Sequence, residues 1–152
     1  MVREWTDLTD AEIARLWLDE SRNGRREGDG IIALADLSLH APERLWTVAL
    51  EILELLRDEE ELLIASIGAG PLEDLLNRHG GDYIDRIVER ARQNRRFRVA
   101  ASCVWPSRID PTIWQRLQAV VQPANGAAQS ATQPPKHRPP KSFKNRRSGR
   151  DE

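Results

Sequence analysis

Apolar side chains recur along this chain at intervals of three and four residues, and no segment alternates apolar and polar residues as a half-buried strand does. This spacing predicts amphipathic helices that each bury one face. The third helix, opened by Pro42, is apolar on most sides and is expected at the centre of the core. The predicted helices span residues 10–21, 30–39, 42–57, 58–67, 71–78, 84–91, 97–105 and 111–121.

Capping residues mark several of the predicted helix ends. Thr9, with Glu12 three residues later, forms a capping box, and Asp110 before Pro111 is typical of a helix N-terminus. We therefore predict an all-α domain of seven or eight short helices packed as irregular helical hairpins. A stack of repeated units would also suit these helices, although the sequence shows no repeating period.

The segment from Gly68 to Gly80 predicts the end of one helix, the start of a short second helix and the end of that second helix. Gly68 and Gly70 are expected to take positive φ angles and to end the preceding helix. Pro71 suits the first position of a short helix, which Gly80 then ends. A β-branched residue at position 70 would resist the backbone conformation expected there.

The same segment opens the one cluster of residue types suited to catalysis or metal binding. Glu73 and Asp74 lie in the first turn of the predicted short helix, where the helix dipole favours negative charge. His79 lies at its end, and Asp82 and Asp85 follow. Their spacing matches no metal-binding motif, so we expect neither a metal ion nor a cofactor. Two interpretations stay open, a structural role at the helix ends and an active site.

Composition changes near residue 122. Residues 1–122 carry 16 basic and 22 acidic side chains, a net charge of −6, whereas residues 123–152 carry 7 basic and 2 acidic ones, a net charge of +5. The second stretch lacks helical periodicity, which predicts a disordered Pro-rich basic tail over residues 123–152 after a helical domain over residues 1–122. Its candidate contacts to nucleic acid are Lys136, Lys141, Phe143, Lys144, Arg146 and Arg147.

Arginines and tryptophans are concentrated in the predicted domain. The basic stretch from Arg90 to Arg98 suits either a nucleic-acid surface or a solvated face balanced by the acids at 58–61, and the acidic domain favours the second. Trp5 precedes the first helix in a polar setting, as a partner contact or as a staple folded onto that helix. We expect three tryptophans in the core: Trp46, Trp105 and Trp114.

Cysteine usage and hydropathy indicate the compartment. Cys103 is the only cysteine, so no internal disulfide can form, and a reducing cytoplasm is expected. The N-terminus shows no apolar signal region, and no apolar run approaches the length of a membrane span. Cys103 lies among apolar residues and is expected to be a small core residue.

Several of these motifs together resemble a known family. Over about residues 8–121 the chain is similar to an uncharacterised bacterial family of all-helical domains of unknown function. The resemblance implies an all-helical fold and a bacterial source, and it implies no activity. It is carried by Trp17, Pro42-Glu43-Arg44-Leu45-Trp46, Gly70-Pro71-Leu72-Glu73-Asp74-Leu75-Leu76, His79-Gly80, Phe97 and Val104-Trp105.

Three functions remain open on the sequence. The leading one is a non-enzymatic cytoplasmic protein-binding domain, in one version an immunity-type or regulatory partner whose acidic surface blocks a basic protein. The second is a nucleic-acid-associated accessory protein that binds through its basic tail. The third is an enzyme that uses the cluster of Glu73, Asp74 and His79.

Overall fold

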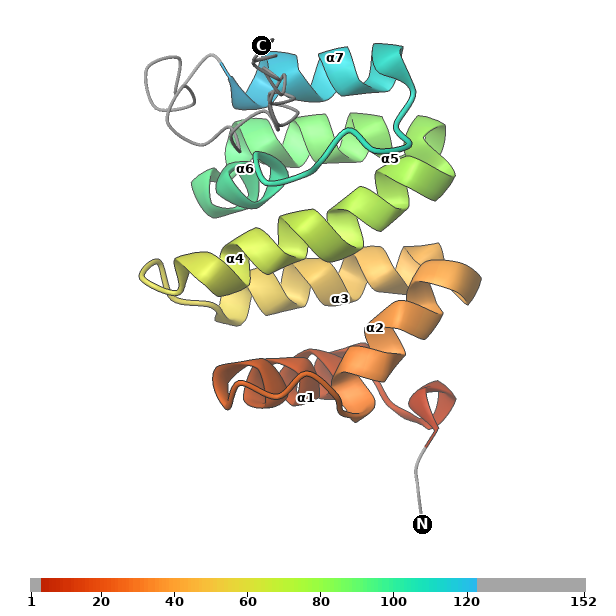
Figure 1. Ribbon diagram of the computed structural model, residues 1–152, viewed down its shortest axis with the longest axis vertical. Coiled ribbons are helices and arrows are strands. Elements are labelled where there is room, and N and C mark those ends of the chain that lie inside the picture. Colours follow the sequence, from red (N-terminus) through yellow and green to blue (C-terminus); the bar gives the residue numbers. More distant parts are fainter. Residues whose placement is uncertain (1–3, 123–152) are drawn as a thin grey trace, which may run out of the picture.

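The computed structural model describes residues 4–122, and every regular element in that range is helical (Figure 1). This confirms the all-α class. The predicted tail, residues 123–152, lies outside the described residues. The elements are the 3-10 turn η1 (Trp5–Asp7), α1 (Asp10–Arg22), α2 (Asp29–His40), α3 (Pro42–Leu55), α4 (Glu61–Ile67), the π-helical turn η2 (Gly68–Leu72), α5 (Glu73–Gln93), α6 (Arg95–Ala101) and α7 (Pro111–Val121).

The helices stack one above another along the long axis, from α1 at one end to α7 at the other (Figure 1). α1 packs on α2 and α3, α3 packs on η2 and α5, and α5 packs on α6 and α7. Each helix therefore packs chiefly on those close to it in the chain, as in repeat proteins. The helices of this part of the chain are therefore stacked on their sequence neighbours, without a repeated unit in the sequence.

The helix caps that the sequence indicated are present. Thr9 Oγ1 accepts a hydrogen bond from the Glu12 N–H at 3.1 Å, and Asp110 Oδ1 accepts one from the Thr112 N–H at 2.8 Å. Pro42 and Pro111 stand at the starts of α3 and α7, where the missing N–H costs no helical hydrogen bond. These local signals place the N-termini of α1, α3 and α7.

The N-terminus of α2 is capped by a residue that the sequence did not single out. Glu20 of α1 is buried, and its carboxylate accepts hydrogen bonds from the N–H groups of Gly30 and Ile31, both at 3.0 Å. The negative charge lies at the positive end of the α2 dipole. This contact fixes α1 against α2.

The helix stops predicted at Gly68 and Gly70 are wrong, whereas the stop predicted at Gly80 matches a kink of the chain at His79, the residue before it. α4, η2 and α5 follow one another directly, and Gly24 is the one described glycine with a positive φ. Pro71 lies inside η2, where the wider π-helical winding accommodates a residue without an N–H. Because α4, η2 and α5 form one continuous run that bends at His79, the described residues contain six separate helical runs besides η1, slightly fewer than the seven or eight helices expected.

Two of these glycines instead allow close packing. A Cβ atom on Gly68 would lie 1.8 Å from the carbonyl oxygen of Ala100 in α6, and one on Gly80 would lie 2.7 Å from Ile113 Cδ1 in α7. A Cβ atom on Gly70 would meet nothing within 4 Å. The sequence motif therefore serves contacts between helices, with Gly68 the most constrained position.

Two further boundaries differ from the prediction. α4 begins at Glu61, not at Asp58, because Glu60 turns back to accept a hydrogen bond from the Arg57 N–H at 3.1 Å. α6 ends at Ala101, so Trp105 falls in the following connection.

The core forms along the centre of the stack. Leu53 and Leu56 are buried as expected for the third helix, at 5% and 3% exposure, and Phe97 is 1% exposed. Trp46 and Trp114 are partly buried against this core. The expectation for Trp105 is wrong, since it is 53% exposed, and Leu62, at an apolar position of the predicted helix 58–67, is 85% exposed.

Candidate protein-binding groove

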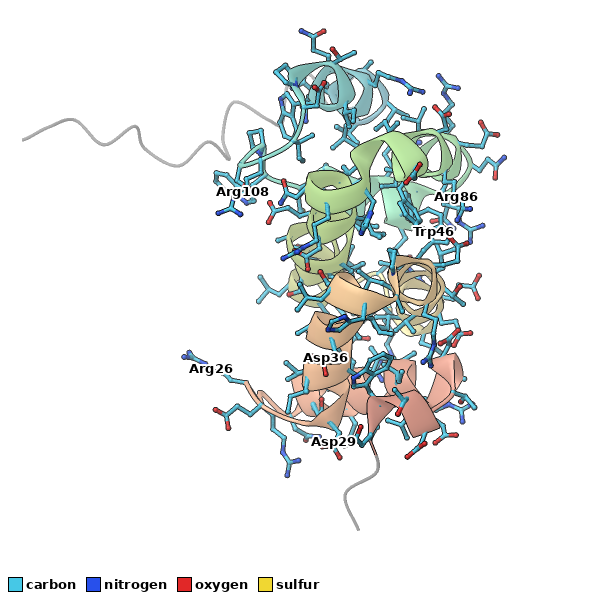
Figure 2. All side chains as sticks on the ribbon, turned by 90° about the vertical axis from the view of Figure 1, so that its right-hand side faces the viewer. Arg26, Asp29, Asp36, Trp46, Arg86 and Arg108 are labelled. Carbon is cyan, nitrogen blue, oxygen red and sulfur yellow. The ribbon has the colours of Figure 1, made fainter. Side chains whose placement is uncertain are left out.

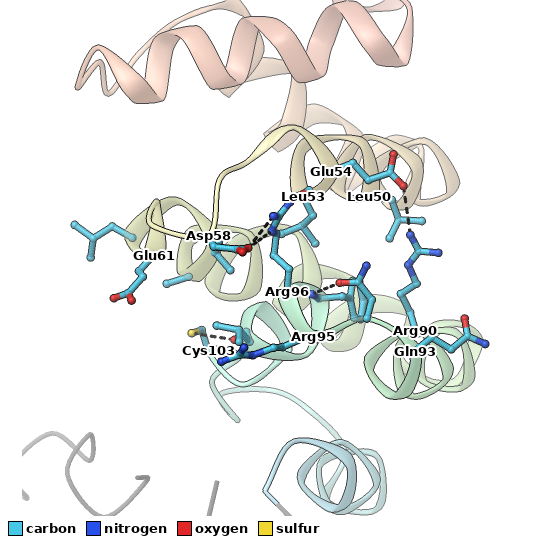
Figure 3. A pocket seen from close by; sticks show the side chains of 16 residues that line it. Leu50, Leu53, Glu54, Asp58, Glu61, Arg90, Gln93, Arg95, Arg96 and Cys103 are labelled. Atoms are coloured by element: carbon cyan, nitrogen blue, oxygen red, sulfur yellow. Dashed lines mark hydrogen bonds and ion pairs between the residues drawn. The ribbon is translucent and has the colours of Figure 1, made fainter. Parts of the chain in front are cut away.

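An open groove of about 1000 Å³ separates the α3–α4 side of the stack from the α5–α6 side (Figure 3). Leu50 and Leu53 from α3, Ile64 from α4 and Phe97 from α6 line it with apolar surface. The groove is therefore bounded by side chains of the helices that make up the stack.

Two exposed apolar side chains lie along this groove. Leu62 from α4 is 85% exposed and Val99 from α6 is 39% exposed, and both line it. An exposed leucine alone is ordinary on a protein surface, whereas apolar residues gathered along a groove are typical of an interaction site. The groove thus offers an apolar floor with further apolar surface along it.

Charged side chains of opposite sign line the two sides. Glu54, Asp58 and Glu61 come from α3, the following turn and α4, and arginines come from α5 and α6. Arg96 bridges the two sides: its Nη2 lies 2.7 Å from Asp58 Oδ1, and its Nη1 donates to the Leu53 carbonyl at 2.8 Å (Figure 3). This residue is committed to holding the groove together.

The other two arginines are less well satisfied. Arg90 Nη2 lies 3.5 Å from Glu54 Oε1, too long for a strong hydrogen bond, and Arg90 Nε is shielded from solvent without an acceptor in the described chain. Arg95 and Glu61 have no hydrogen bond or ion pair within residues 4–122. Arg90 and Arg95 therefore keep unused donor capacity beside an apolar floor.

The predicted basic stretch from Arg90 to Arg98 is divided by the structure. Arg90 and Arg96 face the acids Glu54 and Asp58, and Arg98 donates to the Ala91 carbonyl at 3.3 Å. Within the described residues, Arg92 and Arg95 have no such partner. Part of this stretch is thus balanced by acids near position 58.

The motif residue Glu73 organises the connection between α6 and α7. Its Oε1 accepts a hydrogen bond from the Trp105 N–H at 2.8 Å, and Asn77, one turn later, accepts one from the Arg108 N–H at 3.2 Å. Asp74 is partly buried and has no partner in the described part of the chain. Glu73 therefore has a positioning role in this structure, at a site that sequence reasoning did not connect to Trp105.

His79 lies at a kink of α5, with φ of −138° and ψ of 33°. Its ring centroid is 6.4 Å from that of Tyr83, and no hydrogen bond joins His79 to Glu73 or Asp74 in the described chain. The kink directly precedes Gly80, where α5 approaches Ile113 of α7. The structure thus directs Glu73 and His79 to different neighbours.

Tyr83 is the centre of a polar and aromatic cluster between α3 and α5. Its hydroxyl donates to Glu43 Oε2 at 2.8 Å, and Arg86 donates to Glu43 at 2.6 Å and lies over the Tyr83 ring. Burial, and then the Glu43 carboxylate, raise the pKa of Tyr83 to about 12. Arg86 and Tyr83 in turn lower the pKa of Glu43. Trp46 borders this cluster beside Arg86 (Figure 2).

Trp5, Cys103 and Arg108 lie at separate places on the stack, and the tail candidates lie outside the described residues. Trp5 is partly buried against the core, with the Arg44 guanidinium 5.7 Å from its ring centroid. Cys103 is half-buried and lines the groove. Arg108 lies in the connection between α6 and α7, where its N–H donates to Asn77. Its side chain extends on the side of the stack opposite to Arg86 (Figure 2). The tail candidates lie outside the described residues: Lys136, Lys141, Phe143, Lys144, Arg146 and Arg147.

The described residues hold neither a metal-type cluster nor a helix suited to a membrane. Between residues 4 and 122, no three histidine, cysteine, aspartate or glutamate side chains come together as a metal site would require. In the same range no helix combines the length and the apolar character of a membrane span.

The fold and the groove define an all-helical stacked domain with a preformed surface groove. Its sequence matches a family of unknown function, DUF6869, over residues 29–124, and the chain belongs to that family. The match includes every residue that lines the groove, whereas α1 lies before it. Neither the curated proteins nor the solved structures include a match to this chain.

Proposed function

We propose that this chain is a non-enzymatic, cytoplasmic protein-binding domain that holds a segment of its partner in the groove between α3–α4 and α5–α6. The observation that carries the proposal is the exposed apolar surface along a preformed groove, above all Leu62 at 85% exposure. Apolar surface in contact with water is unfavourable, and a partner's apolar side chains would displace that water on binding. The single cysteine of the sequence suits the reducing cytoplasm.

The groove suits a polypeptide segment better than it suits a compact small molecule. It is open, has apolar side chains from three helices along its floor, and carries charged side chains on its two sides that would set the orientation of a bound segment. Helical stacks use such surfaces to hold extended or helical segments. A regulatory or immunity-type role is the specific version of this proposal, in which bound partner loses its own activity.

A second candidate is nucleic-acid binding through the tail. The division of the arginine stretch favours the tail over the body, because Arg90 and Arg96 already face acids in the groove. The tail carries a net charge of +5 against −6 for residues 1–122. Phosphate contacts by such a tail would be tolerant of sequence and sensitive to salt.

The protein-binding proposal is tested by capture of a partner with matched surface variants. The full-length protein is immobilised in parallel with Leu62→Asp and Ile32→Asp, and each is exposed to lysate of the organism that makes it. Ile32 is a matched control because it is 55% exposed on α2, away from the groove. We expect a stoichiometric partner that Leu62→Asp loses and Ile32→Asp retains. Capture that is equal for all three proteins would refute a role for the groove.

A further inference from the structure

The groove has a chemical asymmetry that identifies what kind of segment it takes. The acids on its α3–α4 side are well exposed, with side-chain exposures of 69% for Glu54 and 87% for Asp58, so water satisfies them in the free protein. On the opposite side, Arg90 Nε is shielded from water and has no acceptor in the described chain. A shielded donor without a partner costs more free energy than an exposed charge.

From this asymmetry we infer that the groove recognises an acidic–apolar peptide segment, in which a bulky apolar side chain lies beside an aspartate or glutamate. This inference rests on the proposed protein-binding function. The apolar side chain packs against the exposed Leu62 and Val99. The carboxylate pairs with Arg95, which has no partner of its own within residues 4–122.

Arg90 supplies the second recognition element. Its 3.5 Å contact with Glu54 is weak enough to be exchanged for a carboxylate in the groove. A guanidinium that turns to a carboxylate can donate from Nε and Nη together, which satisfies the shielded donor. Arg96 keeps its place, because Asp58 and the Leu53 carbonyl already occupy its donors.

The net charge of residues 1–122 favours a basic partner, whereas the groove favours an acidic segment. A domain with a net charge of −6 attracts basic partners at long range, as in the immunity-type version of the proposed function. In the groove itself, the shielded donor without an acceptor in the described chain, Arg90 Nε, belongs to a cation and gains most from an acidic ligand. The charge of the bound segment therefore distinguishes recognition by the groove from attraction by the whole surface.

The test is a selection of random peptides displayed on phage against the full-length protein. Peptides that also bind Leu62→Asp are removed, and the survivors are synthesised with a fluorescent label. We expect a large apolar residue next to aspartate or glutamate among them. Arg95→Glu should weaken their binding about tenfold, as reversal of a charge that contacts the ligand does. Arg92→Glu makes the same charge change on an exposed arginine that does not line the groove, and it should leave binding unchanged.

Several results would overturn the inference. These are peptides that are basic or lack a carboxylate, equal effects of Arg95→Glu and Arg92→Glu, or no peptide that depends on Leu62. Because Arg95 is exposed, circular dichroism of the variant should match the wild type, and Arg95→Gln provides a second variant if it does not. A captured protein partner that needs Leu62 but is indifferent to Arg95 would end this inference and leave the proposed function standing.

Discussion

Gly68 and Gly70 provide a matched pair of substitutions that tests how the motif packs. A Cβ atom on Gly68 would lie 1.8 Å from the Ala100 carbonyl oxygen, and real contacts of this kind are not shorter than 3.0 Å, so η2 and α6 must separate by 1.2 Å or more. The obstructing atom belongs to the backbone and cannot swing away. A Cβ atom on Gly70, two residues later, has open space around it.

The magnitude follows from two opposing terms. Overpacking of this kind costs about 1–3 kcal/mol, and we take the upper end because the backbone of α6 must move. Replacing glycine by alanine in a helix returns about 1 kcal/mol. Gly68→Ala should therefore lower the free energy of unfolding by about 2 kcal/mol, whereas Gly70→Ala should leave it unchanged or raise it by up to about 1 kcal/mol.

The assay is thermal unfolding of the two variants and the wild type, followed by circular dichroism. For a domain of this size, about 2 kcal/mol corresponds to a drop in Tm of about 8 °C. We expect that drop for Gly68→Ala and no drop for Gly70→Ala. Equal Tm values for Gly68→Ala and wild type, or a larger loss for Gly70→Ala, would show that close packing at Gly68 is not what the motif provides.

Three further predictions concern the core, an ion pair and the tail. Leu53→Ala, at a site 5% exposed, should cost about 2–5 kcal/mol in chemical denaturation, and a cost below 1 kcal/mol would contradict its place in the core. Hydrogen bonds from Arg22, then from the Arg57 N–H, lower the pKa of Glu60 from 4.5 to about 2. Its stabilising contribution is thus complete above pH 4.5 and is lost towards pH 2, so wild type and Glu60→Gln should converge in stability on acidification. Truncation after residue 122 should leave Tm unchanged and remove most affinity for a labelled DNA duplex, and equal binding by the truncated protein would assign that binding to the body.

Local signals in the sequence predicted the helices well. The capping box at Thr9 and the Asp110-Pro111 pair act within one turn, and the structure shows the hydrogen bonds expected of them. The apolar spacing placed Leu53 and Leu56 in the core, where both are buried. Such features need only near neighbours in the chain, so a linear pattern contains the information.

Contacts between distant segments were the ones that the sequence did not predict. A glycine that turns the chain and a glycine that lets another helix approach look alike in a sequence, and Gly68 proved to be the second kind. Trp105 was expected in the core because its helix was drawn four residues too long. Its backbone is instead held by Glu73, over 30 positions away.

The groove was missed for the same reason. Leu62 continues an apolar helix pattern, yet it is 85% exposed in the folded chain. The acids at 58–61 were expected to balance the arginine stretch, and Asp58 does pair with Arg96, but the sequence did not indicate that Arg95 has no partner within residues 4–122. The positions of helix ends and charges along a sequence do not indicate which side chains lack hydrogen-bond partners in the folded chain.

Chemical-shift mapping tests the central proposal most directly. The backbone amides of the full-length protein are followed by NMR while the captured partner, or a selected peptide, is added. A partner held in the groove should shift the amides of α4 around Leu62 and those of α6 around Val99, and leave α1 and α2 unperturbed. Shifts confined to α1 and α2, with α4 and α6 unchanged at saturation, would contradict the account.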